Sequence, residues 1–240
     1  MTAPLRAPVA LVTGAGRGIG RAIAVQLARA GCHVAALART ESDLAETAAE
    51  AAADPAAPPV LTLPTDVTRD ADLERAVRVI IERLGRITVL VNNAGFAPPH
   101  STVLKTSLAD WDRTLATCLR APMVLTRLIL PDMLAHGRGT IVNITSIAGQ
   151  RGRAGEASYA AAKFGLLGFT QSLFDEVREH GIQVTAVLPG PVNTEQLPPL
   201  ERARVLRPTD IAAAVLLVLT APPGACPAEI VLEPLHVPEA

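Results

Sequence analysis

Short, nearly continuous apolar runs recur along the chain and are separated by longer segments with apolar residues at helical spacing. Runs of this kind are typical of strands that are buried on both faces of a parallel sheet. We predict seven such strands, at residues 8–13, 32–38, 60–63, 87–91, 140–146, 181–188 and 229–232.

The segments between these runs predict amphipathic helices, and in the first of them Ile23, Leu27 and Ala30 are expected to face inward. The other helices are predicted through Leu44 and Ala51, at about residues 70–84, 111–135 and 208–219, and from Tyr159 through Val177. Pro122 is expected to kink the helix at 111–135. Because strands alternate with helices, we expect a doubly wound parallel β-sheet with helices on both faces. Nothing marks a boundary, so a single domain at 1–240 is predicted.

A glycine-rich turn, Gly14-Ala-Gly-Arg-Gly-Ile-Gly20, joins the first predicted strand to the first helix. Small residues in this position let backbone N–H groups and a helix N-terminus approach an anion, so the turn predicts a phosphate cradle. The usual dinucleotide spacing fails, because Ile19 stands where its third glycine would be. The alternative is that the glycines serve only tight packing.

Ala38 and Arg39 stand at the end of the second predicted strand, where an acidic residue would hydrogen-bond the adenosine ribose and select NAD. No carboxylate is present there to repel a 2′-phosphate, and Arg39 together with Arg17 can bind one. We therefore expect NADP(H) to be preferred over NAD(H). The alternative is that both arginines are solvated surface residues.

The fourth predicted strand delivers Asn92-Asn-Ala-Gly95 at its carboxyl end, where open α/β sheets bind their ligands. Paired asparagines can satisfy exposed backbone groups at the end of a strand, and the small Ala94 and Gly95 allow a flat ring to lie close. The pattern leaves both roles open.

Ser146, Tyr159 and Lys163 form the candidate catalytic group. Tyr159 and Lys163 are four residues apart in a predicted helix, so both side chains leave the same face. An ammonium beside a phenol lowers the tyrosine pKa from about 10, which suits a general acid or base. Ser146 is placed at the carboxyl edge of the sheet. The alternative for the Tyr-x-x-x-Lys pair is chance on a solvated helix face.

Composition strengthens this interpretation, because the chain has only one tyrosine and two lysines, Lys105 and Lys163. A guanidinium does not imitate a compact, rotatable ammonium, so Lys163 is expected to have a role that requires an ammonium group.

The net charge and the lack of recognisable targeting signals make some partners and cellular locations improbable for this chain. The net charge is −1 without a basic run, which makes nucleic acid an improbable partner. The N-terminus lacks a secretion signal, and the longest apolar run, 211–219, is too short to span a membrane. Three widely spaced cysteines fit a reducing compartment, so we expect a cytoplasmic protein. The scattered histidines predict no metal site.

Taken in order, these segments closely resemble the single-domain members of the short-chain dehydrogenase/reductase family, nearest in pattern to 3-oxoacyl-[acyl-carrier-protein] reductases and ketone reductases. The matching motifs are Thr13-Gly-Ala-Gly-Arg-Gly-Ile-Gly20, Asp66-Val67, Asn92-Asn-Ala-Gly95, Ser146, Tyr159-Ala-Ala-Ala-Lys163 and Pro189-Gly-Pro-Val-Asn-Thr194. The resemblance covers nearly the whole chain and implies a Rossmann fold.

The resemblance also implies an NADPH-dependent oxidoreductase that interconverts a carbonyl and an alcohol by hydride transfer. By it, Tyr159 donates the proton, Ser146 hydrogen-bonds the carbonyl oxygen, and Lys163 tunes Tyr159 and holds the nicotinamide ribose. The residues expected to bind the cofactor are Gly14, Arg17, Gly18, Ile19, Gly20, Arg39, Asp66, Val67, Asn93, Ala94, Gly95, Tyr159, Lys163, Pro189, Gly190, Val192 and Thr194.

Two features qualify the resemblance. Family members usually carry an asparagine, whose kinked backbone holds a water in a proton relay, where this chain has Cys118. Cys118 is the only feature that favours the alternative function, a non-catalytic NADP(H)-binding sensor or scaffold protein. The segment after Thr194 is shorter than the helical lid of many relatives, which predicts an open pocket.

The resemblance further implies a homodimer or homotetramer that pairs through the helices beginning near Trp111 and Glu156.

Overall fold

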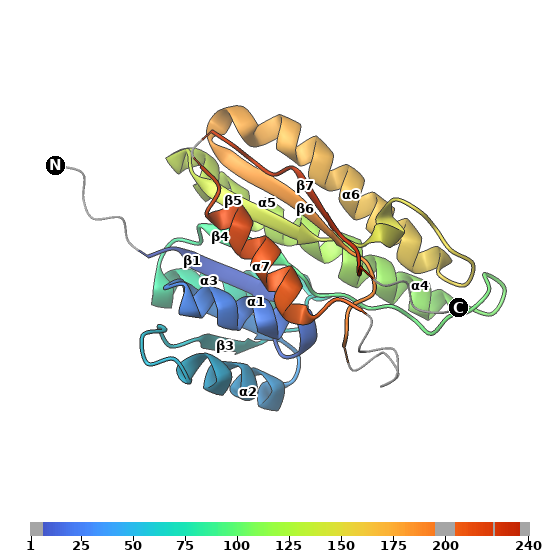
Figure 1. Ribbon diagram of the computed structural model, residues 1–240, viewed down its shortest axis with the longest axis horizontal. Helices are drawn as coiled ribbons and strands as arrows, with labels where there is room; N and C mark the ends of the chain where they lie inside the picture. The colour runs from blue at the N-terminus through green and yellow to red at the C-terminus, as the bar shows by residue number, and fades with distance from the viewer. Residues whose placement is uncertain (1–6, 195–204, 223, 236–240) are drawn as a thin grey trace.

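The strands form one parallel sheet with seven members, in the order β3-β2-β1-β4-β5-β6-β7 (Figure 1). The computed structural model describes residues 7–194, 205–222 and 224–235. The strands are β1 (Val9–Thr13), β2 (His33–Ala38), β3 (Leu61–Pro64), β4 (Val89–Asn92), β5 (Gly139–Ile144), β6 (Ile182–Pro189) and β7 (Glu229–Leu232).

Helices cover both faces of the sheet. On one face lie α1 (Gly18–Arg29), α2 (Glu41–Ala52) and α7 (Pro208–Leu219), and α1 packs against both others. On the other face lie α3 (Asp70–Leu84), α5 (Ala121–His136) and α6 (Ala157–Val177), with α4 (Leu108–Leu115) leading into α5. The chain therefore has the expected doubly wound Rossmann architecture.

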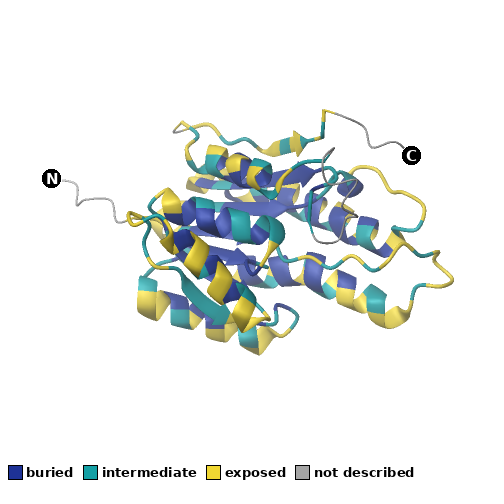
Figure 2. Ribbon diagram, turned by 60° about the horizontal axis from the view of Figure 1, so that its bottom comes forward, coloured by how far each residue is buried: buried dark blue, intermediate teal, exposed yellow. Residues whose placement is uncertain are grey.

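The core is divided by the sheet into two layers, because successive residues of a strand point to opposite faces. In β1, Leu11 packs with the layer of α3, α5 and α6, whereas Val12 packs with the layer of α1, α2 and α7. The five central strands β2, β1, β4, β5 and β6 are buried almost throughout, whereas the edge strands β3 and β7 are half-buried or exposed, and the helices expose their outer faces (Figure 2). Burial on both faces explains why the strands read as continuous apolar runs.

All seven predicted strands are confirmed, with ends that differ from the prediction by at most two residues. The helices predicted at 70–84 and 208–219 have the predicted ends. The inward orientation predicted for Ala30 is wrong, because α1 ends at Arg29 and Ala30 is exposed. Its N–H closes the helix by donating to the carbonyl of Gln26.

The long helix predicted at 111–135 begins earlier, at Leu108, and is interrupted by a π-helical segment, η1 (Ala116–Arg120). In this segment the Ala121 N–H donates to the Ala116 carbonyl, one residue further back than in an α-helix. The α-helical donor for the Cys118 carbonyl would be residue 122, and Pro122 has no N–H. The distortion expected at Pro122 therefore lies in the turn before it.

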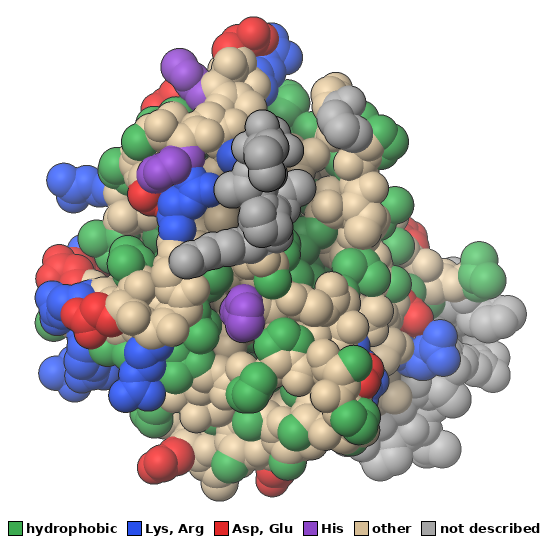
Figure 3. Space-filling model, turned by 90° about the vertical axis from the view of Figure 1, so that its left-hand side faces the viewer, with side chains coloured by type: hydrophobic (Ala, Val, Ile, Leu, Met, Phe, Trp, Pro, Cys, Tyr) green, Lys and Arg blue, Asp and Glu red, His purple; other side chains and the backbone are tan. Residues whose placement is uncertain are grey.

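No helix within the described ranges is long and apolar enough to cross a membrane. On the side of the molecule where the strands begin, acidic and basic side chains lie next to one another (Figure 3). The charges of the chain are thus mixed on this face, in keeping with the net charge of −1.

Candidate active site

The neighbouring strands β1 and β4 form the switch point of the sheet, since the strand order runs outward from them in opposite directions. Ligands of doubly wound sheets bind in the crevice at this point, outside the carboxyl ends of the strands. The glycine-rich turn follows β1, and the segment from Asn93 to Gly95 follows β4. Two of the predicted cofactor segments therefore meet where the topology predicts a ligand.

The glycine-rich turn needs its glycines for backbone geometry. Gly14 and Gly18 have positive φ angles of 64° and 54°, which residues other than glycine rarely adopt. A Cβ on Gly20 would lie 2.1 Å from the Gly14 carbonyl oxygen. No side chain caps the N-terminus of α1 at Arg17, which is exposed. The N–H groups of the first helical turn thus face the crevice uncapped, as an anion site requires.

Two side chains, from α1 and α2, hold the glycine-rich turn by donating hydrogen bonds to its carbonyl groups. Arg21 Nε donates to the Gly16 carbonyl at 2.9 Å, and its guanidinium also pairs with Glu46. Thr47 Oγ1 of α2 donates to the Ala15 carbonyl at 2.8 Å. These bonds draw the carbonyl oxygens toward α1 and α2, which keeps their partial negative charge away from the crevice.

Thr13 attaches the segment after β4 to the end of β1. Its Oγ1 accepts hydrogen bonds from the N–H groups of Asn93 and Ala94 at 2.9 and 3.0 Å. In return, Asn93 Nδ2 donates to the Thr13 carbonyl at 2.9 Å. A Cβ on Gly14 would lie 2.9 Å from the Ala94 Cα, so the two segments are in close contact.

Asp66 and Arg39 lie near one another at the ends of β3 and β2. Burial would raise the pKa of Asp66, but hydrogen bonds from the Thr68 N–H and hydroxyl and the charges of Arg39 and Arg69 outweigh it. The pKa of Asp66 is therefore below its usual value, and the side chain is ionised at neutral pH. Arg39 is exposed, and Val67, which follows Asp66, is buried.

Lys163 is almost completely buried on α6, with 3% of its surface exposed. Its Nζ donates to the carbonyl of Ile144, the last residue of β5, at 2.8 Å. The same atom lies 5.6 Å from the centroid of the Tyr159 ring. The two side chains share a face of α6, as their spacing predicts, and the ammonium contacts the ring face of Tyr159.

Ser146 lies two residues beyond β5 and caps the short 3₁₀ turn η2 (Ile147–Gly149). Its Oγ accepts from the Ala148 N–H at 3.1 Å and lies 3.5 Å from the Pro189 carbonyl oxygen. A Cβ on Gly149 would lie 2.8 Å from the Lys163 carbonyl oxygen. This close packing brings the Ser146 turn against the helix that carries Tyr159 and Lys163.

The segment from Pro189 to Thr194 completes the crevice on the side of β6. The Gly190 N–H donates to the Leu232 carbonyl at 2.7 Å, and Val192 is buried in the core. A Cβ on Gly18 would lie 3.5 Å from Thr194 Cγ2, so this segment borders the glycine-rich turn. The short segment at 195–204, expected to leave an open pocket, lies outside the described residues.

Comparison with known proteins decides the family, because a family model described as short chain dehydrogenase matches residues 8–204. The chain belongs to the short-chain dehydrogenase family. The match covers most of the chain and includes each of the site segments described above.

Individual short-chain dehydrogenases and related reductases match over nearly the whole chain. The 3-oxoacyl-[acyl-carrier-protein] reductase of Synechocystis sp. is 33% identical, with 94% of each chain covered. The acetoacetyl-CoA reductase of Allochromatium vinosum is 35% identical and covers 87% of this chain and 89% of its own. The crystal structure of a metagenomic short-chain oxidoreductase in complex with NADP superposes with a TM-score of 0.84, at 35% identity over 95% of this chain and 97% of that one.

Three residues of this short-chain dehydrogenase support the site but were not among the sequence candidates. Thr13 was noted only as part of the motif, and Arg21 and Thr47 were not singled out. The position of Thr13 at the end of a strand, directly before the glycines, is a signal for a backbone contact. Nothing in the local pattern distinguishes Arg21 or Thr47 from ordinary helix surface residues.

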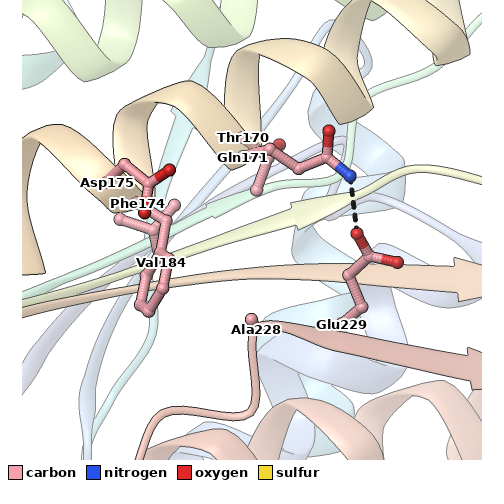
Figure 4. A pocket seen from close by; sticks show the side chains of 7 residues that line it. All are labelled: Thr170, Gln171, Phe174, Asp175, Val184, Ala228 and Glu229. Atoms are coloured by element: carbon pink, nitrogen blue, oxygen red, sulfur yellow. Dashed lines mark hydrogen bonds between the residues drawn. The ribbon is translucent and has the colours of Figure 1, made fainter.

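A separate pocket of about 200 Å³ lies between α6 and the strands β6 and β7, where Gln171 Nε2 donates to Glu229 Oε1 at 2.8 Å (Figure 4). None of the candidate site residues lines it, so it is distinct from the candidate active site. Among the described residues of this short-chain dehydrogenase, no three His, Cys, Asp or Glu side chains are grouped to hold a metal ion.

The structure predicts opposite effects for two glycine-to-alanine substitutions. Gly20→Ala should lower the free energy of unfolding by about 1–3 kcal/mol, because the new methyl group overlaps the Gly14 carbonyl. The matched control is Gly168→Ala on α6, where a Cβ meets nothing within 4 Å. That variant should be more stable by up to about 1 kcal/mol. Urea denaturation followed by circular dichroism measures both, and equal stability of the two variants would contradict the packing argument.

Proposed function

We propose that this chain is an NADPH-dependent reductase or dehydrogenase that interconverts a carbonyl and an alcohol. The observation that carries the proposal is the Lys163 ammonium, buried between the Ile144 carbonyl and the Tyr159 ring in a helix that packs on the Ser146 turn. A structural role for this position does not require a buried charge, whereas a nearby positive charge stabilises the phenolate that proton transfer leaves behind.

The cradle fits the pyrophosphate of a dinucleotide, because the N-terminus of α1 is uncapped and a Cβ on Gly18 would meet no described atom closer than Thr194 Cγ2, at 3.5 Å. When bound, the nicotinamide cofactor supplies or accepts the hydride. Asn93, Ala94 and Gly95 would line its ring, and the segment from Pro189 to Thr194 would border it on the other side.

In the reducing direction Tyr159 donates its phenolic proton to the carbonyl oxygen, and Ser146 donates a hydrogen bond to the same oxygen. Lys163 stabilises the phenolate that remains on Tyr159 through its positive charge. In the oxidising direction the phenolate takes the proton from the alcohol. The two directions use the same groups in opposite protonation states.

The π-helical segment supports reprotonation of Tyr159 despite the missing asparagine. The relay implied by the family resemblance needs a backbone carbonyl that accepts from water. Pro122 has no N–H to donate to the Cys118 carbonyl in the α-helical pattern, so we propose this carbonyl as the acceptor for the relay water, a role that needs no asparagine side chain. The substitution at Cys118 therefore does not by itself favour a non-catalytic sensor or scaffold.

The preference for NADP(H) rests on Arg39 and Arg17, which border the expected position of the adenosine ribose without a neighbouring strand-end carboxylate at residue 38. The solved relative with bound NADP supports this choice. The names of the curated relatives support a 3-oxoacyl thioester or a similar ketone as the substrate class.

Association of chains is proposed through the outer faces of α5 and α6, which expose large apolar residues such as Met123 and Phe164. Exposed apolar groups of this size on adjacent helices are typical of subunit interfaces. A homodimer or homotetramer would cover them. We further propose a cytoplasmic location, because Cys32, Cys118 and Cys226 are all free thiols.

Tyr159→Phe tests the proposed chemistry. The variant should lose about 10²–10⁴-fold in kcat, since it lacks the proton donor. Its Kd for NADPH, measured by fluorescence titration, should stay within about threefold because the ring remains. Activity is measured as NADPH oxidation with 3-oxoesters, ketones, quinones and aldehydes. Turnover that survives the substitution would rule out Tyr159 as the proton donor, and tight NADPH binding without any wild-type turnover would favour a sensor.

Arg39→Asp tests the cofactor preference. Removing the positive charge and adding a carboxylate should raise the Kd for NADPH by about 10–100-fold, the range expected for a charge-assisted contact. The Kd for NADH should change little or fall, because a carboxylate can accept from the ribose hydroxyls. Arg78→Asp, an exposed arginine on α3, is the control. Equal NADPH affinities for the two variants would show that Arg39 does not contact the 2′-phosphate.

Phe164→Glu tests the proposed association surface. A charge on the outer face of α6 should shift the chain to a smaller species in size-exclusion chromatography with light scattering. Ile81→Glu on α3 is the control, because Ile81 and Phe164 are similarly exposed, at 50% and 46%. A wild-type monomer, or a Phe164→Glu variant that keeps the wild-type mass, would contradict the proposed interface.

A further inference from the structure

The segment after β4 is fixed at both ends by hydrogen bonds from other parts of the fold. Thr13 holds its first two residues, as described above. At the far end, the Phe96 N–H donates to Cys118 Sγ at 3.3 Å, and the Cys118 thiol donates to the Phe96 carbonyl at 3.4 Å. Cys118 is completely buried. One thiol thus pairs both backbone groups of Phe96.

The side chain of Phe96 is held as well. The guanidinium of Arg113 on α4 lies 4.0 Å from the centroid of the Phe96 ring, within the range of a cation–π contact. We call Cys118, Phe96 and Arg113 together the Phe96 clamp. Arg113 precedes the π-helical segment and Cys118 lies inside it, so the clamp fastens the segment after β4 to this part of the α4–α5 helix.

The π-helical segment in turn packs against the catalytic helix. A Cβ on Gly165 of α6 would lie 2.9 Å from Leu119 Cδ2, so the Leu119 side chain packs directly against Gly165. Gly165 is two residues from Lys163, and Leu119 is adjacent to Cys118. A continuous path of contacts therefore runs from Phe96 through Cys118 and Leu119 to the helix of Lys163.

We propose that Cys118 is a positioning residue of the reaction, acting through its thiol on Phe96. By pairing the N–H and the carbonyl of Phe96, the thiol fixes the distance between the segment from Asn93 to Phe96 and α6. That segment is proposed to line the nicotinamide, while α6 carries Tyr159, so the clamp sets the cofactor ring relative to the proton donor. The inference rests on the proposed function.

The residue at position 118 must be able both to donate and to accept a hydrogen bond, because Phe96 presents both an N–H and a carbonyl to it. A thiol offers a weak S–H donor and a sulfur acceptor at one atom. An apolar residue of the same size would leave the N–H and carbonyl of the half-buried Phe96 without these partners, which removes the stabilisation that the two bonds contribute. A serine keeps the donor and acceptor, although its C–O bond is shorter.

Two substitutions at this position separate hydrogen bonding from packing. Cys118→Val fills the space without the bonds, and Cys118→Ser keeps the bonds with a smaller side chain. We expect kcat to fall about tenfold in the valine variant, with a larger primary isotope effect from NADPH deuterated at C4, and to stay within about threefold in the serine variant. If Cys118→Val keeps the wild-type kcat while Cys118→Ser loses activity, Cys118 acts through packing and the proposal is overturned. A wild-type kcat in both variants would overturn it as well.

Cys32→Val is the matched control, because Cys32 is also buried but lies in the core layer of α1, α2 and α7. It should leave kcat and the isotope effect unchanged. Arg113→Leu, which does not disturb the buried thiol, should give a smaller loss of about two- to fivefold. Combined with Cys118→Val it should lower kcat by less than the product of the two single effects, because both act through Phe96. Strictly multiplicative effects would contradict the clamp.

Hydrogen exchange of the unliganded protein tests the clamp independently of turnover. The Phe96 N–H should exchange at least tenfold faster in Cys118→Val than in the wild type, and at nearly the wild-type rate in Cys118→Ser. If the wild type proves inactive but this exchange pattern is found, the proposed function fails and the clamp stands. Equal exchange in the wild type and the valine variant would refute the clamp whatever the activity.

Discussion

The burial of the Lys163 ammonium is the constraint on which the arrangement at the carboxyl ends of the strands depends. Moving an ammonium out of water costs several kcal/mol, so it must be met by fixed partners. The Ile144 carbonyl provides one, which ties α6 to the end of β5, and the Tyr159 ring provides the other. Gly149 then lets the turn after β5 close over the same helix. One charge thereby holds a strand end, a helix and a turn together.

Around this centre, the fold fixes its strand-end segments with side chains that bond to backbone groups. Thr13 and Cys118 act in this way on the segment after β4, and Thr47 does so on the glycine-rich turn. Segments beyond the end of a strand have lost their sheet partners, so their N–H and carbonyl groups need others. Hydroxyl and thiol groups supply them without adding net charge next to the expected anion.

The sequence predicted the fold well, because the five central strands are buried on both faces and therefore appear as apolar runs. The motifs also placed Gly20, Lys163 and the segment after β4 at the same edge of the sheet. The π-helical segment could not be predicted, since proline shows where a hydrogen bond is missing but not how neighbouring turns adjust to it. Ala30 was misplaced because helix ends depend on local capping, which apolar spacing does not report.

The contact between Cys118 and Phe96 was hidden for a different reason. The two residues are 22 positions apart, and Cys118 lies in a π-helical segment that the sequence pattern does not reveal. A buried cysteine is usually only a small apolar residue, so its type carried no signal for a paired hydrogen bond. Local pattern thus predicted candidate chemistry-bearing residues but not the side chains that contact the segments around them.

The scarcity of aromatic residues gives this protein two built-in optical reporters. Tyr159 is the only tyrosine of the chain, so any change in tyrosine absorption belongs to the phenol beside Lys163. Trp111 is the only tryptophan and lies on α4, within one turn of Arg113. Absorption therefore follows α6 and emission follows α4, and ligand-induced movement of each helix can be recorded without an added label.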